Sequence, residues 1–182
     1  MTREALGGRQ VRPLAPSDRP LVAALFASEP QFRDAEAAVA VELFHLGIGD
    51  GTAPPADPDY RWLGVEQHGV LAGCACYGPT PGTDGTFDLY WIAVAPASQG
   101  RGLGRLLISH VEHAVARDGG RLVVIETSGS DAYVGTRAFY LSCGYALLAT
   151  IHDFYAPGEH RLIFGALVAD LPLAAEPARA LG

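Results

Sequence analysis

The chain has 182 residues, of which 49% are hydrophobic and 18% are charged, and its formal net charge is −7 at pH 7. This length and composition suit one globular domain and exclude a disordered chain. The acidic balance argues against nucleic acid or an anionic membrane as a partner, because both favour a basic surface.

Hydrophobic periodicity and turn residues predict the elements of the first half in chain order. Residues 10–14 read as a strand, and 19–28 as a helix whose N-terminus Ser17 or Asp18 would cap. A second helix is expected at 33–46, followed by a long loop at 47–59 that is rich in Gly, Pro and Asp. Two strands, 60–67 and 70–77, meet at a hairpin turn formed by His68 and Gly69.

The second half alternates strands and helices. A strand at 86–94 leads to a helix at 102–118, which Gly119 and Gly120 would end. The remaining expected elements are a buried strand at 121–127, a helix at 131–143, and a final strand pair at 145–154 and 161–169. This order predicts an α/β fold, mixed α+β, with a mostly antiparallel sheet of about seven strands and helices on both faces. We expect a single domain over 10–169, a loose start at 1–9 and an Ala/Pro-rich tail at 170–182.

The most informative segment is the glycine-rich loop between the strand at 86–94 and the helix that follows it. Gly100, Gly102 and Gly104 alternate with Arg101 and Leu103. Backbone N–H groups and the positive end of a helix dipole make such a loop a site for a phosphate. A dinucleotide fingerprint would need glycine where Arg105 stands, and a P-loop would need lysine, which the chain lacks. The alternative is a helix start whose glycines only permit close packing.

Residues Gln99 to Gly104 resemble the Gln/Arg-x-x-Gly-x-Gly/Ala signature of the GNAT acyltransferases. The order of elements over 10–169 is also similar to that family's fold. The resemblance implies that the loop holds the pyrophosphate of acetyl-CoA, the acyl donor, and that the preceding strand aligns the pantetheine. The cofactor-binding residues that it implies are Ile92, Ala93, Val94, Gln99, Gly100, Arg101, Gly102, Leu103, Gly104 and Arg105.

A second motif, Arg137 to Tyr145, is similar to the family's Ala/Arg-x-Phe-Tyr-x-x-x-Gly-Phe/Tyr segment. By this resemblance Tyr140 would protonate the departing thiolate; the alternative is an aromatic core residue. The chain departs from the pattern at Tyr133 and Thr136, where many members carry Asn and Ala. Contacts to the pantetheine or to the helix start are therefore in doubt.

The attacking amine must lose a proton, which requires a carboxylate or a chain of water molecules. Asp88 and Glu126 are the candidate bases, because each interrupts an otherwise apolar strand. Either carboxylate could instead be solvated or bonded to backbone donors. The segment 153–159 resembles a turn that closes over the acceptor in some family members, or it is a simple proline–glycine turn.

These features predict an N-acetyltransferase that moves an acetyl group from acetyl-CoA to a primary amine by direct attack. Asp88, Glu126, Asp153 and Glu159 favour a small cationic acceptor. The alternatives are a non-catalytic acetyl-CoA sensor and a different donor such as succinyl-CoA. A homodimer is one option for the assembly.

Cysteine and histidine spacing predicts neither a disulfide nor a metal site. Cys74 and Cys76 lie two apart in an apolar run and read as small buried residues, and His110 and His113 have no further ligands beside them. The N-terminus lacks the apolar run of a signal peptide, and no apolar stretch approaches the length of a membrane span. We therefore expect a cytoplasmic protein.

Overall fold

A computed structural model describes residues 8–171. The predicted loose start at 1–9 and tail at 170–182 therefore lie outside the described residues, except for two residues at each end. The strands and α-helices are β1 (Arg9–Pro13), α1 (Arg19–Ser28), α2 (Asp34–Ile48), β2 (Arg61–Gln67), β3 (Val70–Pro79), β4 (Thr86–Val94), α3 (Leu103–Arg117), β5 (Leu122–Ser128), α4 (Val134–Ser142), β6 (Ala146–Ala156) and β7 (Glu159–Leu167). No described helix is long and apolar enough to span a membrane.

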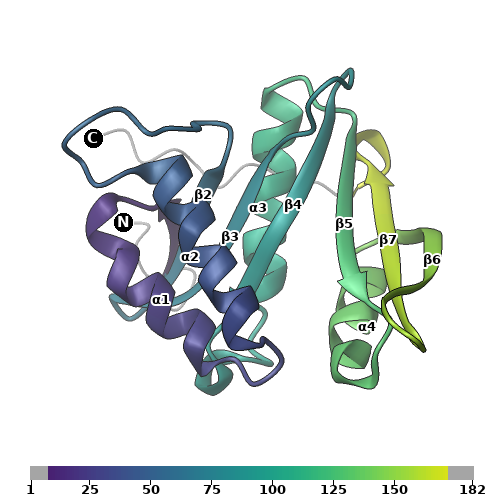
Figure 1. Ribbon diagram of the computed structural model, residues 1–182. Coiled ribbons are helices and arrows are strands. Elements are labelled where there is room, and N and C mark those ends of the chain that lie inside the picture. The colour runs from purple at the N-terminus through teal and green to yellow at the C-terminus, as the bar shows by residue number, and fades with distance from the viewer. Residues whose placement is uncertain (1–7, 172–182) are drawn as a thin grey trace. The chain divides into compact units, whose positions relative to one another are not determined.

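The described residues form a sheet of seven strands in the order β1-β2-β3-β4-β5-β7-β6. Figure 1 shows β7 between β5 and β6. The pairs β1–β2, β2–β3, β5–β7 and β6–β7 are antiparallel. This arrangement confirms the predicted mixed fold with a mostly antiparallel sheet. The predicted order of elements is also confirmed, and β4 begins and ends at the expected residues.

The chain forms two compact units. The first comprises the chain up to Pro79 together with Leu89–Ile108, and the second comprises Thr80–Asp88 and the described residues from Ser109 on. In the first unit α1 contacts α2 and β3, and α2 contacts β2. Its core consists of apolar side chains from these elements and β4: Leu14, Val22, Leu25, Phe26, Ala40, Phe44, Trp62, Cys74, Cys76 and Ala93.

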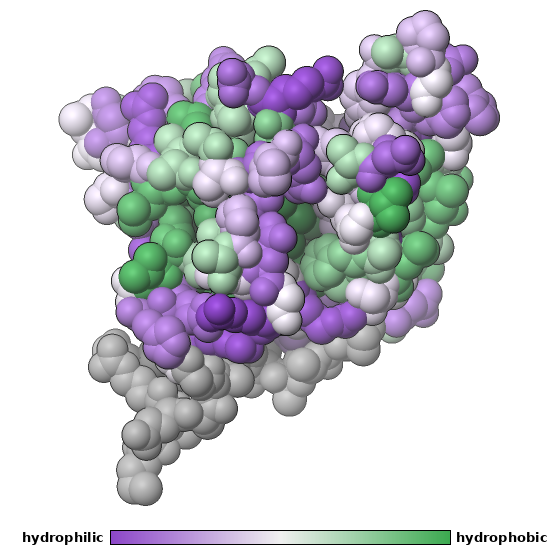
Figure 2. Space-filling model, turned by 90° about the horizontal axis from the view of Figure 1, so that it is seen from below, coloured by the Kyte–Doolittle hydropathy of each residue, from purple (hydrophilic) through white to green (hydrophobic). Residues whose placement is uncertain are grey.

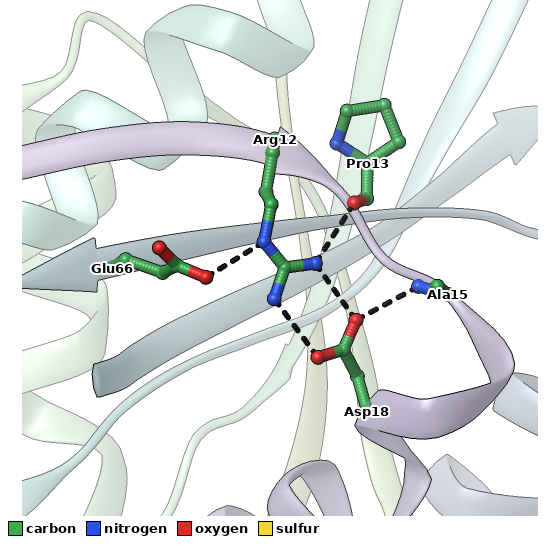
Figure 3. Close-up of polar contacts among 5 residues, drawn as sticks. All are labelled: Arg12, Pro13, Ala15, Asp18 and Glu66. Carbon is green, nitrogen blue, oxygen red and sulfur yellow. Dashed lines mark hydrogen bonds and ion pairs between the residues drawn. The ribbon is translucent and has the colours of Figure 1, made fainter. Parts of the chain in front are cut away.

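An ionic cluster joins the start of α1 to the first two strands (Figure 3). The Arg12 guanidinium donates to both carboxylate oxygens of Asp18, at 2.7 and 2.9 Å, and to Glu66 at 2.7 Å. The Asp18 carboxylate also accepts the N–H of Ala15. Asp18 is the N-cap residue of α1, one of the two predicted, but its side chain bonds these donors and makes no hydrogen bond to the N–H groups of the helix. Arg12 holds the pKa of Asp18 below its usual value.

The second unit is built on β5, β7 and β6 with α4 and the later part of α3. Its buried residues include Val111, Val115, Val123, Ile125, Tyr140, Tyr145 and Phe164. The Tyr145 hydroxyl donates to Glu112 of α3 at 3.1 Å in this interior. Large apolar side chains of α4 and β6 also reach the surface here: Val134, Leu141, Leu147, Leu148, Ile151 and Phe154. Figure 2 shows apolar patches on one face of the molecule.

Turns fall where the glycines predicted them. His68 and Gly69 both have a positive φ, 54° and 79°, which matches the right-handed twist of the β2–β3 hairpin. Gly119, with φ 76°, follows α3, and Gly144, with φ 95°, follows α4. The long predicted loop is shorter at its start, because α2 continues to Ile48.

Candidate functional site

The glycine-rich loop connects β4 to α3 in the first unit. Gly100 and Gly102 both adopt left-handed backbone conformations, with φ of 70° and 79°. A Cβ atom at either position would have no protein atom within 4 Å. These glycines are therefore required by the backbone conformation and not by packing, which removes the close-packing alternative for both of them.

The loop presents donors and positive charge around the start of α3. The N–H of Leu106 donates to the carbonyl of Gly102 and closes the first turn, so the earlier N–H groups of the helix lack intrahelical acceptors. Backbone that includes left-handed residues, as at Gly100 and Gly102, is typical of loops whose N–H groups form a concavity for an anion. Arg101 and Arg105 are both exposed beside it. This donor set fits a diphosphate group.

Gln99 differs from the rest of the loop, because its donors face the protein. Its side-chain amide donates to both oxygens of Glu29 and to the carbonyl of Val94. Its backbone N–H donates to Pro96. The Gln99 side chain thus bonds Glu29 and Val94 within the protein, whereas a direct contact of Gln99 with the cofactor stays a prediction.

The final residues of β4 lead directly into the loop. Ala93 is buried, whereas Ile92 and Val94 are partly exposed. Gly73 of β3 permits the close approach of β4, because a Cβ there would lie 2.8 Å from the Ala93 carbonyl oxygen. The Val94 carbonyl already accepts the Gln99 amide, so one of its two lone pairs is occupied.

Tyr140 belongs to the second unit and lies on α4. Only 5% of its surface is exposed, and its ring packs beside Phe139, Tyr145 and Phe164. Burial raises the pKa of its phenol well above the usual value, and the neighbouring Cys143 and Tyr133 add to the rise. The hydroxyl therefore stays protonated at physiological pH.

Asp88, near the start of β4, is a half-buried carboxylate. It accepts a hydrogen bond of 2.6 Å from the Thr80 hydroxyl. Burial raises the pKa of Asp88; the Thr80 hydroxyl opposes this, Glu126 adds to it, and Arg161 lowers the pKa again. The structure therefore brings the two predicted base candidates into one electrostatic neighbourhood.

Glu126 on β5 forms an ion pair with Arg161 on β7. The Arg161 guanidinium also lies 4.7 Å from the centre of the Phe154 ring, within the range of a cation–π contact. Sequence reasoning missed Arg161, because its contact with Glu126 depends on register. Ser128 pairs with Arg161, so Glu126 lies diagonally opposite it on the same face.

The turn between β6 and β7 uses Asp153 internally. Its Oδ1 accepts the N–H of Gly158 at 2.8 Å, and its own N–H donates to Nδ1 of His160 at 3.0 Å. Asp153 has φ 52°, and its side chain is largely exposed. These contacts favour the simple-turn interpretation of 153–159 over a carboxylate held ready for a substrate.

Among the described residues, no group of three or more His, Cys, Asp and Glu side chains could hold a metal ion. Cys74, Cys76 and Cys143 are buried thiols that form no disulfide among the described residues. Burial raises the pKa of the Cys74 and Cys76 thiols well above their usual values, so neither is a ready nucleophile.

The profile of the Acetyltransferase (GNAT) family matches residues 25–145, which include the glycine loop and Tyr140. The chain belongs to this family. A crystal structure of a GNAT-family protein from Desulfovibrio desulfuricans shares 41% identity, with a TM-score of 0.79 over 88% of this chain and 99% of the other. These similarities confirm the predicted family and fold, those of the GNAT acetyltransferases.

Two further relatives carry informative names. An amino-acid acetyltransferase from Ralstonia nicotianae is 34% identical over 102 residues, which is 55% of this chain but only 20% of that protein. The chain thus matches about a fifth of that relative's length. The structure of yncA from Salmonella typhimurium, solved with acetyl-CoA, shares 19% identity and the fold, with a TM-score of 0.66 over 94% of this chain and 99% of the other.

Proposed function

We propose that this chain is an N-acetyltransferase that moves the acetyl group of acetyl-CoA to a primary amine by direct attack. The observation that carries the proposal is the left-handed pair Gly100 and Gly102 at the start of α3, beside two exposed arginines. Membership of the GNAT family and a structural neighbour solved with acetyl-CoA support it.

In this proposal the loop binds the pyrophosphate of coenzyme A. Backbone N–H groups of Gly100, Gly102, Leu103 and Gly104 donate to phosphate oxygens, and the Arg101 and Arg105 side chains add positive charge. The Ile92–Val94 backbone aligns the pantetheine and the thioester. The Gln99 side chain stabilises the loop through its hydrogen bonds to Glu29 and Val94.

Tyr140 is the proposed general acid, which protonates the thiolate as it leaves. A phenol whose pKa is raised by burial is fully protonated at neutral pH and so can donate. The assignment of this role comes from the family's motif around Tyr140, and the aromatic-core interpretation is its competitor.

Asp88 is the better of the two candidate bases. Its carboxylate is half-buried, has a raised pKa and bonds one neutral hydroxyl. The Glu126 carboxylate is already engaged in an ion pair with Arg161. We therefore assign deprotonation of the amine to Asp88, directly or through water.

The acceptor is proposed to be a small amine, with a cationic amine as the first class to test. The name of the Ralstonia relative places amino acids in the same panel. A non-catalytic acetyl-CoA sensor is the competing function, and free thiol release from acetyl-CoA in the presence of this panel distinguishes the two. A cytoplasmic location and a homodimer stay predictions.

The loop assignment is tested by calorimetry of coenzyme A binding to three proteins: wild type, Gly102→Ala and Gly102→Asp. Alanine adds only the strain of a non-glycine residue in a left-handed conformation, about 1–2 kcal/mol. Aspartate tolerates this conformation better than alanine, so it adds no greater strain, but it places a negative charge facing the phosphates. We expect alanine to weaken binding modestly and aspartate to abolish it.

Thermal melting without ligand provides the control, because it measures the backbone strain of each variant and the Cβ of neither would meet a neighbouring atom. Folded Gly102→Asp protein that binds coenzyme A as tightly as Gly102→Ala would contradict the assignment.

A further inference from the structure

The buried carboxylate of Glu29 lies against the glycine-rich loop. Glu29 follows α1, and only 4% of its surface is exposed. Its hydrogen-bond partner among the described side chains is Gln99, whose amide reaches Oε1 at 3.0 Å and Oε2 at 3.2 Å. The contact joins residues 70 positions apart, all within the first unit.

This position is costly for a carboxylate. Burial removes its hydration, and the C-terminus of a helix carries partial negative charge. Burial accordingly raises the pKa of Glu29, and the hydrogen bond from Gln99 opposes the rise. For stability alone, an apolar side chain would suit this buried position better than a carboxylate. The location of Glu29 beside the loop therefore suggests that its carboxylate has a role in the loop.

The Gln99 amide connects three elements at one point. One nitrogen donates to Glu29 at the end of α1 and to the carbonyl of Val94 at the end of β4. Gln99 itself is the residue immediately before Gly100, so its side-chain contacts fix the direction in which the loop leaves β4. The loop's donors are thereby oriented before any ligand arrives.

Aromatic packing holds Glu29 in place. Phe26 and Phe32 flank it in sequence, and each lies 5.6 Å from Trp91 of β4, ring centre to ring centre, in edge-on contact. Phe26 and Phe32 also contact one another. The same strand thus carries both the aromatic anchor and the Val94 carbonyl, which makes the α1–β4 connection rigid.

We propose that Glu29 is a positioning residue for coenzyme A binding: through Gln99 it holds the glycine-rich loop in the conformation that accepts the pyrophosphate. The inference rests on the proposed function, because it deepens the assignment of the same loop. Glu29 touches no phosphate in this proposal, and its effect passes entirely through the Gln99 amide.

Four variants test the connection by calorimetry with coenzyme A and by steady-state kinetics: Glu29→Leu, Glu29→Gln, Gln99→Leu and the double leucine variant. Glu29→Leu keeps the volume and removes the acceptor, whereas Glu29→Gln retains an acceptor oxygen and removes the charge. The exposed carboxylate Glu42, on α2, supplies the matched control as Glu42→Gln.

We expect Glu29→Leu and Gln99→Leu each to weaken coenzyme A binding by about tenfold, the effect of losing one hydrogen bond to a charged group. The double variant should be no weaker than either single variant, because both break one connection. Glu29→Gln should recover most of the affinity. KM for acetyl-CoA should rise in step, while kcat and KM for the acceptor stay near wild type.

Three results would overturn the inference. Wild-type affinity for coenzyme A in both single leucine variants would show that the Glu29–Gln99 contact does not affect binding. Fully additive losses of affinity in the double variant would show that the two residues act independently. A raised KM for the acceptor alone would make Glu29 an acceptor contact. If Glu29→Leu fails to fold, Gln99→Leu carries the test, because Gln99 lies at the surface. Failure of wild-type protein to bind coenzyme A would instead contradict the proposed function.

Discussion

At the scale of single residues, the side chains proposed for catalysis differ most in how their protonation is controlled. Tyr140 is kept neutral by burial among aromatic rings, whereas Asp88 is half-buried between a hydroxyl, a carboxylate and a guanidinium. A buried phenol that stays protonated can donate a proton, and a carboxylate with a raised pKa is a stronger base once it is ionised, so the two groups suit the acid and base roles.

Replacing Tyr140 by Phe keeps the ring packing and removes only the proton donor. Turnover is expected to fall by roughly 10²–10⁴-fold, the range typical of general acid–base catalysis. Coenzyme A affinity, measured by calorimetry, should barely change. The pH–rate profile is recorded for both proteins, so that a change of rate-limiting step is visible. Turnover near wild type across the pH profile would contradict the catalytic role and leave Tyr140 as an aromatic core residue.

The proposed base predicts a specific pH dependence. Because Asp88 must be ionised to accept a proton, kcat/KM should rise with pH through its pKa, which burial places above the ordinary value. The Thr80 hydroxyl stabilises the charged form, so Thr80→Val should raise this pKa further and move the acid limb to higher pH. Asp88→Asn should remove the limb and most of the activity.

Glu126→Gln is the comparison for this pH experiment. In the wild type the Glu126 carboxylate pairs with Arg161 and raises the pKa of Asp88. Its removal should therefore lower the pKa of Asp88 and move the acid limb of the pH profile to lower pH. Loss of the limb in Glu126→Gln, with the limb retained in Asp88→Asn, would make Glu126 the base.

At the scale of elements, the Arg12 cluster connects β1, β2 and the start of α1 (Figure 3). Arg12→Met keeps much of the side-chain volume but leaves the buried Asp18 carboxylate without its cation. We expect a loss of about 2 kcal/mol in the free energy of unfolding at pH 7, since an unpaired buried charge is costly. Urea unfolding measures it.

The pH dependence of this loss follows from the lowered pKa of Asp18. A carboxyl whose folded pKa lies below its unfolded value stabilises the fold above the unfolded pKa, about 4, and loses this contribution as pH falls through the folded pKa. The difference between wild type and Arg12→Met should therefore shrink below about pH 4. Arg33→Met is the control, because Arg33 is largely exposed and its ion pair with Glu36 is a local one on the surface. An equal loss in both variants would contradict the cluster's role.

At the scale of the whole chain, local sequence patterns predicted the elements better than they predicted the contacts between distant residues. The strand β4, the glycine loop and the helix that follows were all predictable, because periodicity and glycine placement act over a few residues. The Gln99–Glu29 and Glu126–Arg161 contacts join residues far apart in sequence, so they depend on strand order and register. Asp18 is the N-cap residue of α1, within the predicted pair, but the Arg12 partner of its carboxylate could not be predicted from local pattern.

The charge of the whole chain bears on the acceptor. A net charge of −7, with Asp88 and Glu159 among the carboxylates on the predicted acceptor-side elements, should attract an ammonium group. Two other members of that set are already engaged, Glu126 by Arg161 and Asp153 by the Gly158 N–H, so the attraction should be modest. Salt weakens it, because the Debye length shrinks to about 8 Å at 0.15 M ionic strength.

The measurement is KM for a cationic amine and for a neutral amine of similar size, over a series of salt concentrations. KM for the cationic acceptor should rise with ionic strength, whereas KM for the neutral acceptor should stay flat. The glycine-rich loop carries Arg101 and Arg105, so KM for acetyl-CoA should have its own dependence on salt. It provides a second charged substrate with which the cationic amine is compared. A constant KM for the cationic amine, or a preference for the neutral one, would show that these carboxylates are only solvated and that neutral contacts select the acceptor.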